Sequence, residues 1–326
     1  MAKFTAHSIG YYYKDYDGNT VGSATTAFGA VTSMDLPLNT ETNGDDSGAI
    51  YDEARYVISQ LPEFNFTTKS VDILLSLTGL NGACFDGASP TDGITIYGQV
   101  VNDCKDKPAA TDNAAILITR GMIRTTSLDA TRGEDVTANF TIDPIWDGSN
   151  TPIIASFSGV TLPTIPLPFV FTLGNSEIDG QSIQDPTSIN LDFGISTFDK
   201  LPALGQVWPD TVGVQKVQPV MTVRSRNPSI FNTTGAGAGV HLMGSEADHV
   251  DTRIQFKRRS TLNAFQPIGI AGLHMYYTMH GIFMPNNPFM ASGQDIAELE
   301  ARVEGVNDGV NAPVSFFTET AYDPTL

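Results

Sequence analysis

The sequence predicts an all-β fold with minor α content: a β-sandwich or barrel of a tube-forming type with a short flanking helix, or two such halves. Three observations lead to this class. Apolar and polar residues alternate with a period of two in many short segments. Turn-forming Gly, Pro, Asn and Asp separate these segments. Only 17% of the residues are charged, and the many Thr and Ser residues suit sheets with wide polar faces better than long surface helices.

The charge balance restricts the partners of the protein. The 326 residues include 36 acidic and 18 basic side chains, a net charge of −18. Tight binding to nucleic-acid phosphates or to an anionic membrane needs clustered Lys and Arg, so neither is favoured. The first ten residues lack the apolar core of a secretory signal, and no run of about 18 apolar residues predicts a membrane span. We therefore expect folding in a cytoplasm.

In the first half of the chain, strand signals alternate with turns. Asp17-Gly18 predicts a hairpin turn between two β-prone runs. Strands are expected at 64–67, 94–101, 114–127 and 136–146, with reversals at Arg132-Gly133 and Asp147-Gly148. Residues 35–53 have no basic side chain and predict an exposed acidic loop containing Asp35, Glu41, Asp45, Asp46, Asp52 and Glu53.

One short helix is expected in this half, at about 69–78. Val71, Leu74, Leu75 and Thr78 recur at i, i+3, i+4 and i+7, and Gly79 follows as a C-cap signal. This helix would flank the sheet of a first domain at 1–159.

A proline-rich stretch at 160–169 divides the chain. Pro163, Pro166 and Pro168 cannot donate hydrogen bonds to a sheet ladder, so we expect an extended linker. A second β-rich domain would then occupy 170–326.

In this second domain, alternation predicts strands at 189–196, 217–224, 252–258 and 270–284. Residues 295–303 open with an acidic turn, which the helix dipole favours, and they predict a short C-terminal helix. Each half would thus hold several strands and one helix. A duplication is compatible with this order, although no aligned motif supports it.

The chain has no catalytic, metal or cofactor motif of any specificity, so we predict no enzyme activity and no cofactor. Asp15, Asp17 and Asn19 alternate as in an EF-hand loop, but Thr20 stands where that loop needs Gly. His249 and Asp251 are the nearest approach to a metal pair. A hydrolase with dispersed catalytic residues is the weakest alternative, and it predicts loss of activity when either of these two is changed.

The two cysteines, Cys84 and Cys104, flank the expected strand region at 94–101. A disulfide between them is geometrically feasible. Two free thiols are the alternative expected of a cytoplasmic protein.

The basic residues gather between 216 and 259, where acidic residues are few. One interpretation is a subunit interface that meets the acidic 35–53 loop or the acidic 295–323 tail of a neighbouring copy. The other is a solvated sheet edge, which Lys and Arg protect against aggregation. The candidate interface residues are Arg224, Arg226, Arg253, Lys257, Arg258 and Arg259, with Lys216 nearby.

With these patterns, the chain resembles the major tail tube proteins of tailed bacteriophages over about residues 40–285. The resemblance rests on the hairpin region at 120–148, the stretch at 49–57, the short helix after residue 69, and the run Val217-Gln-Pro-Val-Met-Thr-Val-Arg224. The family has almost no signature motif, so no single residue carries it. It implies a β-sandwich or barrel core and a long hairpin that lines a tube.

The resemblance also implies a role and partners. The chain would be a virion structural protein of the tail, assembled in the host cytoplasm, with other tail proteins as partners and no membrane. It would form stacked rings, either hexameric, or trimeric with pseudo-sixfold symmetry if both halves are tube-like. DNA would pass through an acidic lumen without specific binding. Our candidates for lumen-facing acids are Asp129, Glu134 and Asp135.

Two other classes remain open. Another virion component, such as a capsid or decoration protein, would share the composition. A β-sandwich binding module, for example for carbohydrate, would need a cluster of exposed aromatic side chains, and Tyr11, Tyr12, Tyr13 and Tyr16 form the only such cluster.

Overall fold

The computed structural model describes thirteen segments of the chain: 3–14, 20–45, 54–73, 83–85, 93–101, 113–165, 169–183, 185–198, 200–227, 249–259, 274–284, 289–290 and 298–319. Within these segments, the only regular element that is not a strand is a short 3-10 turn, η1, at Val71–Ile73. All strand pairings there are antiparallel. The predicted all-β class is confirmed.

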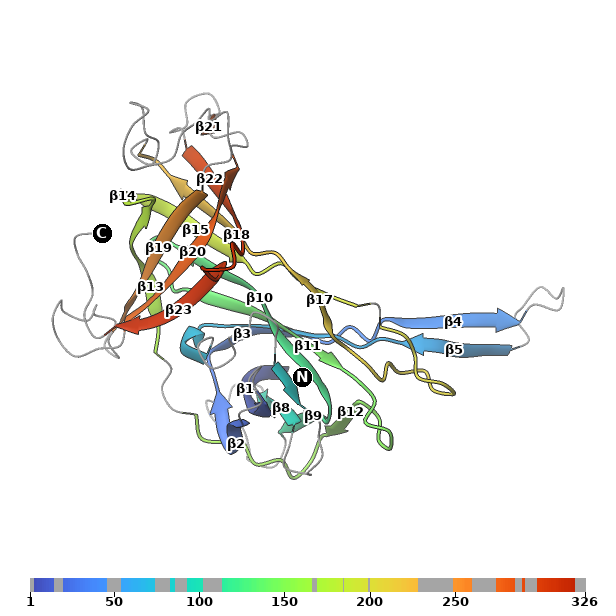
Figure 1. Cartoon of the computed structure of the whole chain (residues 1–326). Coiled ribbons are helices and arrows are strands. Elements are labelled where there is room, and N and C mark those ends of the chain that lie inside the picture. The colour runs from blue at the N-terminus through green and yellow to red at the C-terminus, as the bar shows by residue number, and fades with distance from the viewer. Residues whose placement is uncertain are drawn as a thin grey trace.

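The first half of the chain folds into two antiparallel layers (Figure 1). One layer has the order β2-β1-β8-β9-β12 and the other has the order β3-β6-β11-β10, with β7 bridging β1 and β10. The long β4–β5 hairpin projects away from both. The strands are β1 (Lys3–Lys14), β2 (Thr20–Phe28), β3 (Val31–Asp35), β4 (Thr40–Asp45), β5 (Ala54–Gln60), β6 (Phe64–Thr68), β7 (Ala83–Phe85), β8 (Gly93–Val101), β9 (Ala114–Ile118), β10 (Gly121–Thr131), β11 (Thr137–Pro144) and β12 (Ile153–Ser156).

The second half repeats this plan. One layer is β14-β13-β19-β20-β23, and the other is β15-β18-β22, completed by the end of β20 and by β21. The strands are β13 (Phe171–Ile178), β14 (Gln181–Ser182), β15 (Pro186–Asp192), β16 (Ile195–Thr197), β17 (Val214–Val217), β18 (Val220–Ser225), β19 (His249–Arg258), β20 (His274–Met284), β21 (Phe289–Met290), β22 (Glu298–Gly305) and β23 (Val314–Glu319).

Apart from β7, which has no counterpart among the described strands of the second half, the two halves correspond in their strands. Equivalent layers have the same chain order and the same strand partners. The layer β2-β1-β8-β9-β12 matches β14-β13-β19-β20-β23, and the layer β3-β6-β11-β10 matches β15-β18-β22-β20/β21. Each half also inserts a separate hairpin, β4–β5 or β16–β17, between the equivalent strands. We therefore describe the chain as repeat 1, residues 3–156, and repeat 2, residues 171–319. Residues 160–165 and 169–170 between them contain no strand or helix.

The register of the strands confirms that the halves are equivalent. A β-bulge interrupts β3 between Val31 and Ser33, opposite Thr68 and Thr67 of β6. The same bulge interrupts β15 between Pro186 and Ser188, opposite Ser225 and Arg224 of β18. The residue before each bulge strand has a positive φ, 52° at Ala30 and 53° at Asp185. Such a φ is uncommon for residues other than Gly, so its recurrence indicates a common architecture.

A sequence motif marks the same turn in both repeats. Asp147-Gly-Ser-Asn-Thr-Pro152 follows β11, and Asp308-Gly-Val-Asn-Ala-Pro313 follows β22. In each turn the aspartate accepts hydrogen bonds from the backbone N–H groups two and three residues later, at 2.6–2.7 Å. It also accepts one from the asparagine side chain, at 3.0 Å in the first turn and 2.9 Å in the second. The duplication that the sequence left open is therefore present in topology, register and turn chemistry.

The helix predicted at 295–303 is wrong. Residues 298–305 form β22, between β18 and β20. Leu299, Ala301 and Val303 are buried, while the residues between them are only half-buried. This period-two burial, together with two neighbouring strands, outweighs the local preference for a helix.

The flanking helix predicted at 69–78 is not seen as an α-helix in the described residues. The chain there forms only η1 at Val71–Ile73, and residues 74–78 lie outside the described segments. The acidic 35–53 stretch is not a simple loop either, because β4 and β5 pair across it. Residues 46–53 are outside the described segments.

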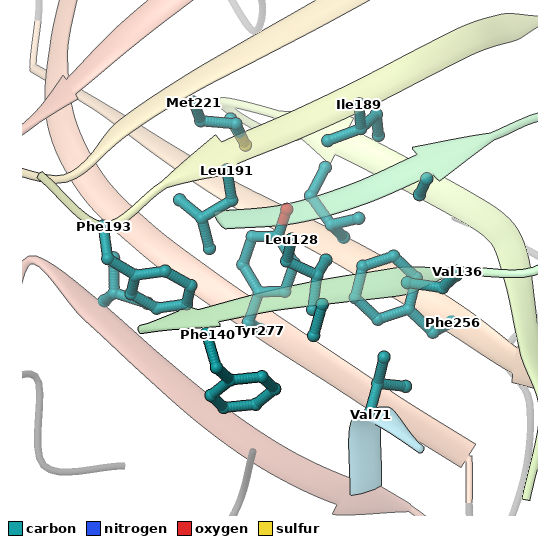
Figure 2. Close-up of a cluster of buried hydrophobic side chains, with 14 of the residues drawn as sticks. Val71, Leu128, Val136, Phe140, Ile189, Leu191, Phe193, Met221, Phe256 and Tyr277 are labelled. Carbon is teal, nitrogen blue, oxygen red and sulfur yellow. The ribbon is translucent and has the colours of Figure 1, made fainter. Parts of the chain in front are cut away.

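The core of repeat 2 includes side chains from repeat 1. Leu128 of β10 and Val136 are fully buried beside Phe256 and Tyr277 (Figure 2). The backbone N–H of Val136 donates to the carbonyl of Phe171 at 2.8 Å. Burial, with a smaller contribution from the Asp129 carboxylate, raises the pKa of Tyr277 well above its ordinary value. The two repeats are therefore joined by a shared core as well as by the connecting chain.

Candidate assembly surface

The seam between the repeats is a strand pairing. The second half of β10, Ser127–Thr131, pairs antiparallel with β15 of repeat 2, with Leu128 opposite Leu191 and Asp129 opposite Asn190. This pairing joins the layers of the two repeats into one sheet with the order β3-β6-β11-β10-β15-β18-β22-β20. The chain thus already contains one strand junction between consecutive repeats.

The strands equivalent to the two sides of this seam lie at opposite ends of the sheet. β3 is the counterpart of β15, and among the described strands it pairs only with β6. β21 is the counterpart of the second half of β10, because Phe289 pairs with Leu299 as Leu128 pairs with Ala138. Within the described part of the chain, β21 pairs only with β22. Each end of the sheet therefore presents one half of the seam.

One face of this sheet has a row of hydrogen-bonded polar side chains across the seam. Thr67 Oγ1 donates to Asn139 Oδ1 at 2.6 Å, and Asn139 Nδ2 donates to Asp129 Oδ2 at 2.8 Å. Asn190 Nδ2 of repeat 2 donates to the other oxygen of Asp129. These side chains are half-buried, whereas the opposite face packs into the core. Asp129, a predicted lumen-facing acid, thus lies at the centre of this polar face.

The other two predicted lumen acids occupy different surroundings. Asp135 binds Lys69 Nζ at 2.8 Å and Arg259 Nη1 at 2.8 Å, so its charge is balanced at the seam. Glu134 is exposed in the turn between β10 and β11, and its carbonyl accepts a hydrogen bond from Thr172 Oγ1. The three acids therefore do not form one cluster.

The predicted basic interface residues separate into two groups. Arg258 and Arg259 lie at the seam: Arg258 stacks over the Phe169 ring at 3.3 Å, and Arg259 binds Asp135 and the carbonyl of Gly133. Burial lowers the pKa of Arg258, and Asp72 opposes that effect.

The remaining basic residues lie on the strands of repeat 2. Arg224 binds Glu300 at 3.0 Å, Arg226 lies 3.8 Å from Glu298, and Arg253 stacks over Tyr276 at 4.4 Å. Lys257 on β19 faces Thr172 in the ladder. The structure thus does not bring the six residues into one patch.

A buried ion network fixes the loop of repeat 2 onto repeat 1. Asp143 of β11 has no exposed side-chain surface, and it binds Arg124 Nε at 2.9 Å and Lys200 Nζ. Lys200 follows the β16 strand and also binds Glu63 at 2.9 Å. The backbone N–H of Trp146 donates to the carbonyl of Pro209, which lies in the same loop as Lys200, at 2.7 Å. Sequence reasoning missed this network, because its members are far apart in the chain.

The β4–β5 hairpin is the most protruding described feature (Figure 1). Consecutive residues of β5 are exposed, including the apolar Tyr56 (54%), Val57 (42%) and Ile58 (47%). An isolated two-stranded hairpin is at best marginally stable in water. The exposed apolar residues on this extension make it a candidate surface for a contact with another molecule.

The other candidate sites of the sequence have ordinary surroundings or fall outside the described residues. Asp251 binds His280 Nδ1 at 2.7 Å, while His280 Nε2 lies 3.3 Å from Asp308. Cys84 lies exposed on β7, and Cys104 lies outside the described residues, so the disulfide stays a prediction. Asp15, Asp17, Asn19 and Tyr16 are also outside them.

Comparison with known proteins gives no family. No protein-family model matches the chain, and no curated protein matches its sequence. In the described segments no group of three or more His, Cys, Asp or Glu side chains is arranged to hold a metal ion. A helix able to span a membrane is likewise absent from the described segments. The geometry of the two repeats is therefore the main guide to function.

Proposed function

We propose that this chain is a virion structural protein whose copies join head to tail into a ring, and that the rings stack into the tail tube of a bacteriophage. The observation that carries the proposal is the β10–β15 seam. It joins one repeat to the next within the chain, and the ends of the same sheet carry the equivalent strands, β21 and β3. Copies would associate by repeating a junction that the fold already contains.

The internal seam defines the register of the junction between copies. Leu128 faces Leu191, and Asp129 faces Asn190. In the repeat correspondence Phe289 takes the position of Leu128, and Leu36 takes the position of Leu191. Phe289 of one copy would therefore face Leu36 of the next, an apolar pair in both junctions. A contact between two different surfaces closes a ring when the rotation per copy allows it.

Two tube-like repeats per chain favour a trimeric ring with pseudo-sixfold symmetry over a hexameric one. The polar face around Asp129 would line the lumen, where acidic side chains repel DNA and let it pass without binding. The β4–β5 hairpin would contact the adjacent ring or another tail protein. Pairing of β3 with β21 would also protect two sheet edges that otherwise promote aggregation.

Negative-stain electron microscopy of the purified protein tests the proposal. Hollow tubes or stacked rings with a central pore are expected. Closed shells would instead favour a capsid protein, and monomers at every concentration would contradict assembly of the chain alone.

Cross-linking tests the register in the same preparation. In a Cys84→Ser, Cys104→Ser background, Leu36→Cys with Phe289→Cys should form a disulfide between chains on oxidation. Leu36→Cys with Val310→Cys is the matched control, because Val310 is 88% exposed on a turn away from β21. Equal cross-linking in both pairs would contradict the β3–β21 junction.

A further inference from the structure

Repeat 1 has an open, mainly apolar groove beside the edge of β3 that no other described strand pairs with. It has a volume of about 420 Å³ and is lined by residues of β1, β3, β8 and β9 and by Phe157. Several lining residues are small, among them Ala6, Gly98 and Ala114. Phe157 at its rim is 68% exposed.

The same positions in repeat 2 are filled. The strand registers align Ala6 with Leu173, and Gly98 with Phe256. They align Ala114 with Met275 and Ile116 with Tyr277. Phe256, Met275 and Tyr277 are at most 2% exposed. The two repeats thus share a backbone plan but differ at this site, since repeat 1 has small residues where repeat 2 has large ones.

In repeat 2, side chains of repeat 1 cover the positions that are equivalent to the groove. The end of β10 and the turn that follows place Leu128 and Val136 beside Phe256 and Tyr277 of repeat 2 (Figure 2). Both side chains, and that of Ala130, are buried. Leu128 and Ala130 face Leu191 and Ile189 of β15 in the ladder. The core of a repeat is therefore completed by the end of the β10-type strand of the preceding repeat. Among the described residues, no strand of this kind pairs with β3 and covers the groove of repeat 1.

We propose that the groove of repeat 1 is the binding site for the β21 end of a second copy of this chain, with Phe289 in the role that Leu128 has at the internal seam. This inference rests on the proposed head-to-tail ring and adds the side-chain contact that holds it. The small groove residues Gly98 and Ala114 leave room for Phe, which is larger than Leu. Filling the groove in this way removes apolar surface from water on both copies.

Substituting the repeat 2 residue into repeat 1 tests the groove. Ala114→Met introduces the side chain present at Met275 and should occupy the groove. The monomer should keep its melting temperature, while the concentration needed for assembly should rise by about tenfold or more. Ala155→Met is the matched control, because Ala155 is exposed on β12, outside the groove. If Ala114→Met lowers the melting temperature, Ala6→Leu, which copies Leu173, replaces it.

The possible outcomes distinguish a failure of the groove contact from a failure of the proposed ring. Assembly of both groove variants at the wild-type concentration, with Leu36–Phe289 cross-links still formed, would overturn the groove and leave the ring intact. Absence of cross-links and of tubes in the wild type would overturn the ring itself. Loss of assembly in the groove variants but not in Ala155→Met is the expected result. A small apolar molecule that binds the groove of wild-type monomer without affecting assembly would also overturn the inference.

Discussion

Gly121 and Gly281 occupy the same position in the two repeats, and both lie against a backbone carbonyl. A Cβ atom on Gly121 would be closer to the carbonyl oxygen of Asp143 than 3.0 Å, and one on Gly281 would be equally close to that of Glu304. Asp143 and Glu304 are themselves equivalent in the ladders. At each glycine the chain passes from the first layer of its repeat into the second. The missing side chain lets the neighbouring strand approach the backbone closely there.

Alanine at either glycine should destabilise the protein. The added methyl group would meet backbone, which cannot rotate away, so we expect Gly121→Ala and Gly281→Ala each to lower the free energy of unfolding by about 3 kcal/mol. Gly133→Ala is the control, because nothing lies within 4 Å of its Cβ position and only its φ of +82° is unfavourable. It should cost about 1 kcal/mol. Urea denaturation would measure all three.

Lys200 should be important for stability, because it neutralises a fully buried carboxylate. Lys200→Met would leave Asp143 with Arg124 as its remaining charge partner. Removing one member of a buried ion pair costs about 3 kcal/mol. Lys216→Met, on the exposed face of β17, should have almost no effect. Equal unfolding free energies for the two variants in urea denaturation would show that the network is not stabilising.

The alternation of apolar residues predicted the strands well, because burial of one face requires it. The helix predicted at 295–303 came instead from the acidic opening of that segment, and it was wrong because Leu299, Ala301 and Val303 follow the period of a strand. The twice-repeated Asp-Gly-x-Asn-x-Pro motif was a visible signal of the duplication. It was missed because the rest of the repeats has diverged in side chains while keeping the register of the ladders.

The candidate surface was much less predictable than the fold. Clustering of Arg and Lys in the sequence suggested a basic patch, but neighbouring positions on a strand point to opposite faces, and Arg258 and Arg259 turn toward the seam. The groove depends on which strands become neighbours, and it contains residues as distant as Thr5 and Phe157. A local pattern in the sequence cannot show which of these distant residues become neighbours in the fold.

Charge reversal should lower the stability of the protein more at the seam than on the outer surface. Arg259 is 20% exposed and binds Asp135, so Arg259→Glu should lower the free energy of unfolding by about 2 kcal/mol. Arg226 is 56% exposed, and Arg226→Glu should change that free energy by less than about 0.5 kcal/mol. Chemical denaturation would measure the free energy of unfolding of each variant, and light scattering would measure its assembly. A stable Arg259→Glu variant would contradict a stabilising role for this contact.

Acid should weaken the turn that follows β22. The backbone N–H of Asn311, with that of Val310, the Asn311 side chain and the charge of His280, lowers the pKa of Asp308 from 3.8 to about 2. Because the folded-state pKa is the lower one, the stabilisation is complete above pH 3.8 and is lost as the pH falls toward 2. Asp308→Asn should therefore melt below the wild type at pH 6, and the difference should shrink in acid. A constant difference would contradict this linkage.

The β4–β5 hairpin should matter for assembly but not for folding. Tyr56, Val57 and Ile58 are exposed on a two-stranded extension, so replacing all three with Ser removes apolar surface without opening a cavity. We expect an unchanged melting temperature of the monomer and shorter tubes or single rings in electron micrographs. A control triple substitution to Thr at Ile154, Phe198 and Leu201, which are also exposed, should leave tube length unchanged. If the hairpin variant forms tubes of normal length, the extension has no part in stacking.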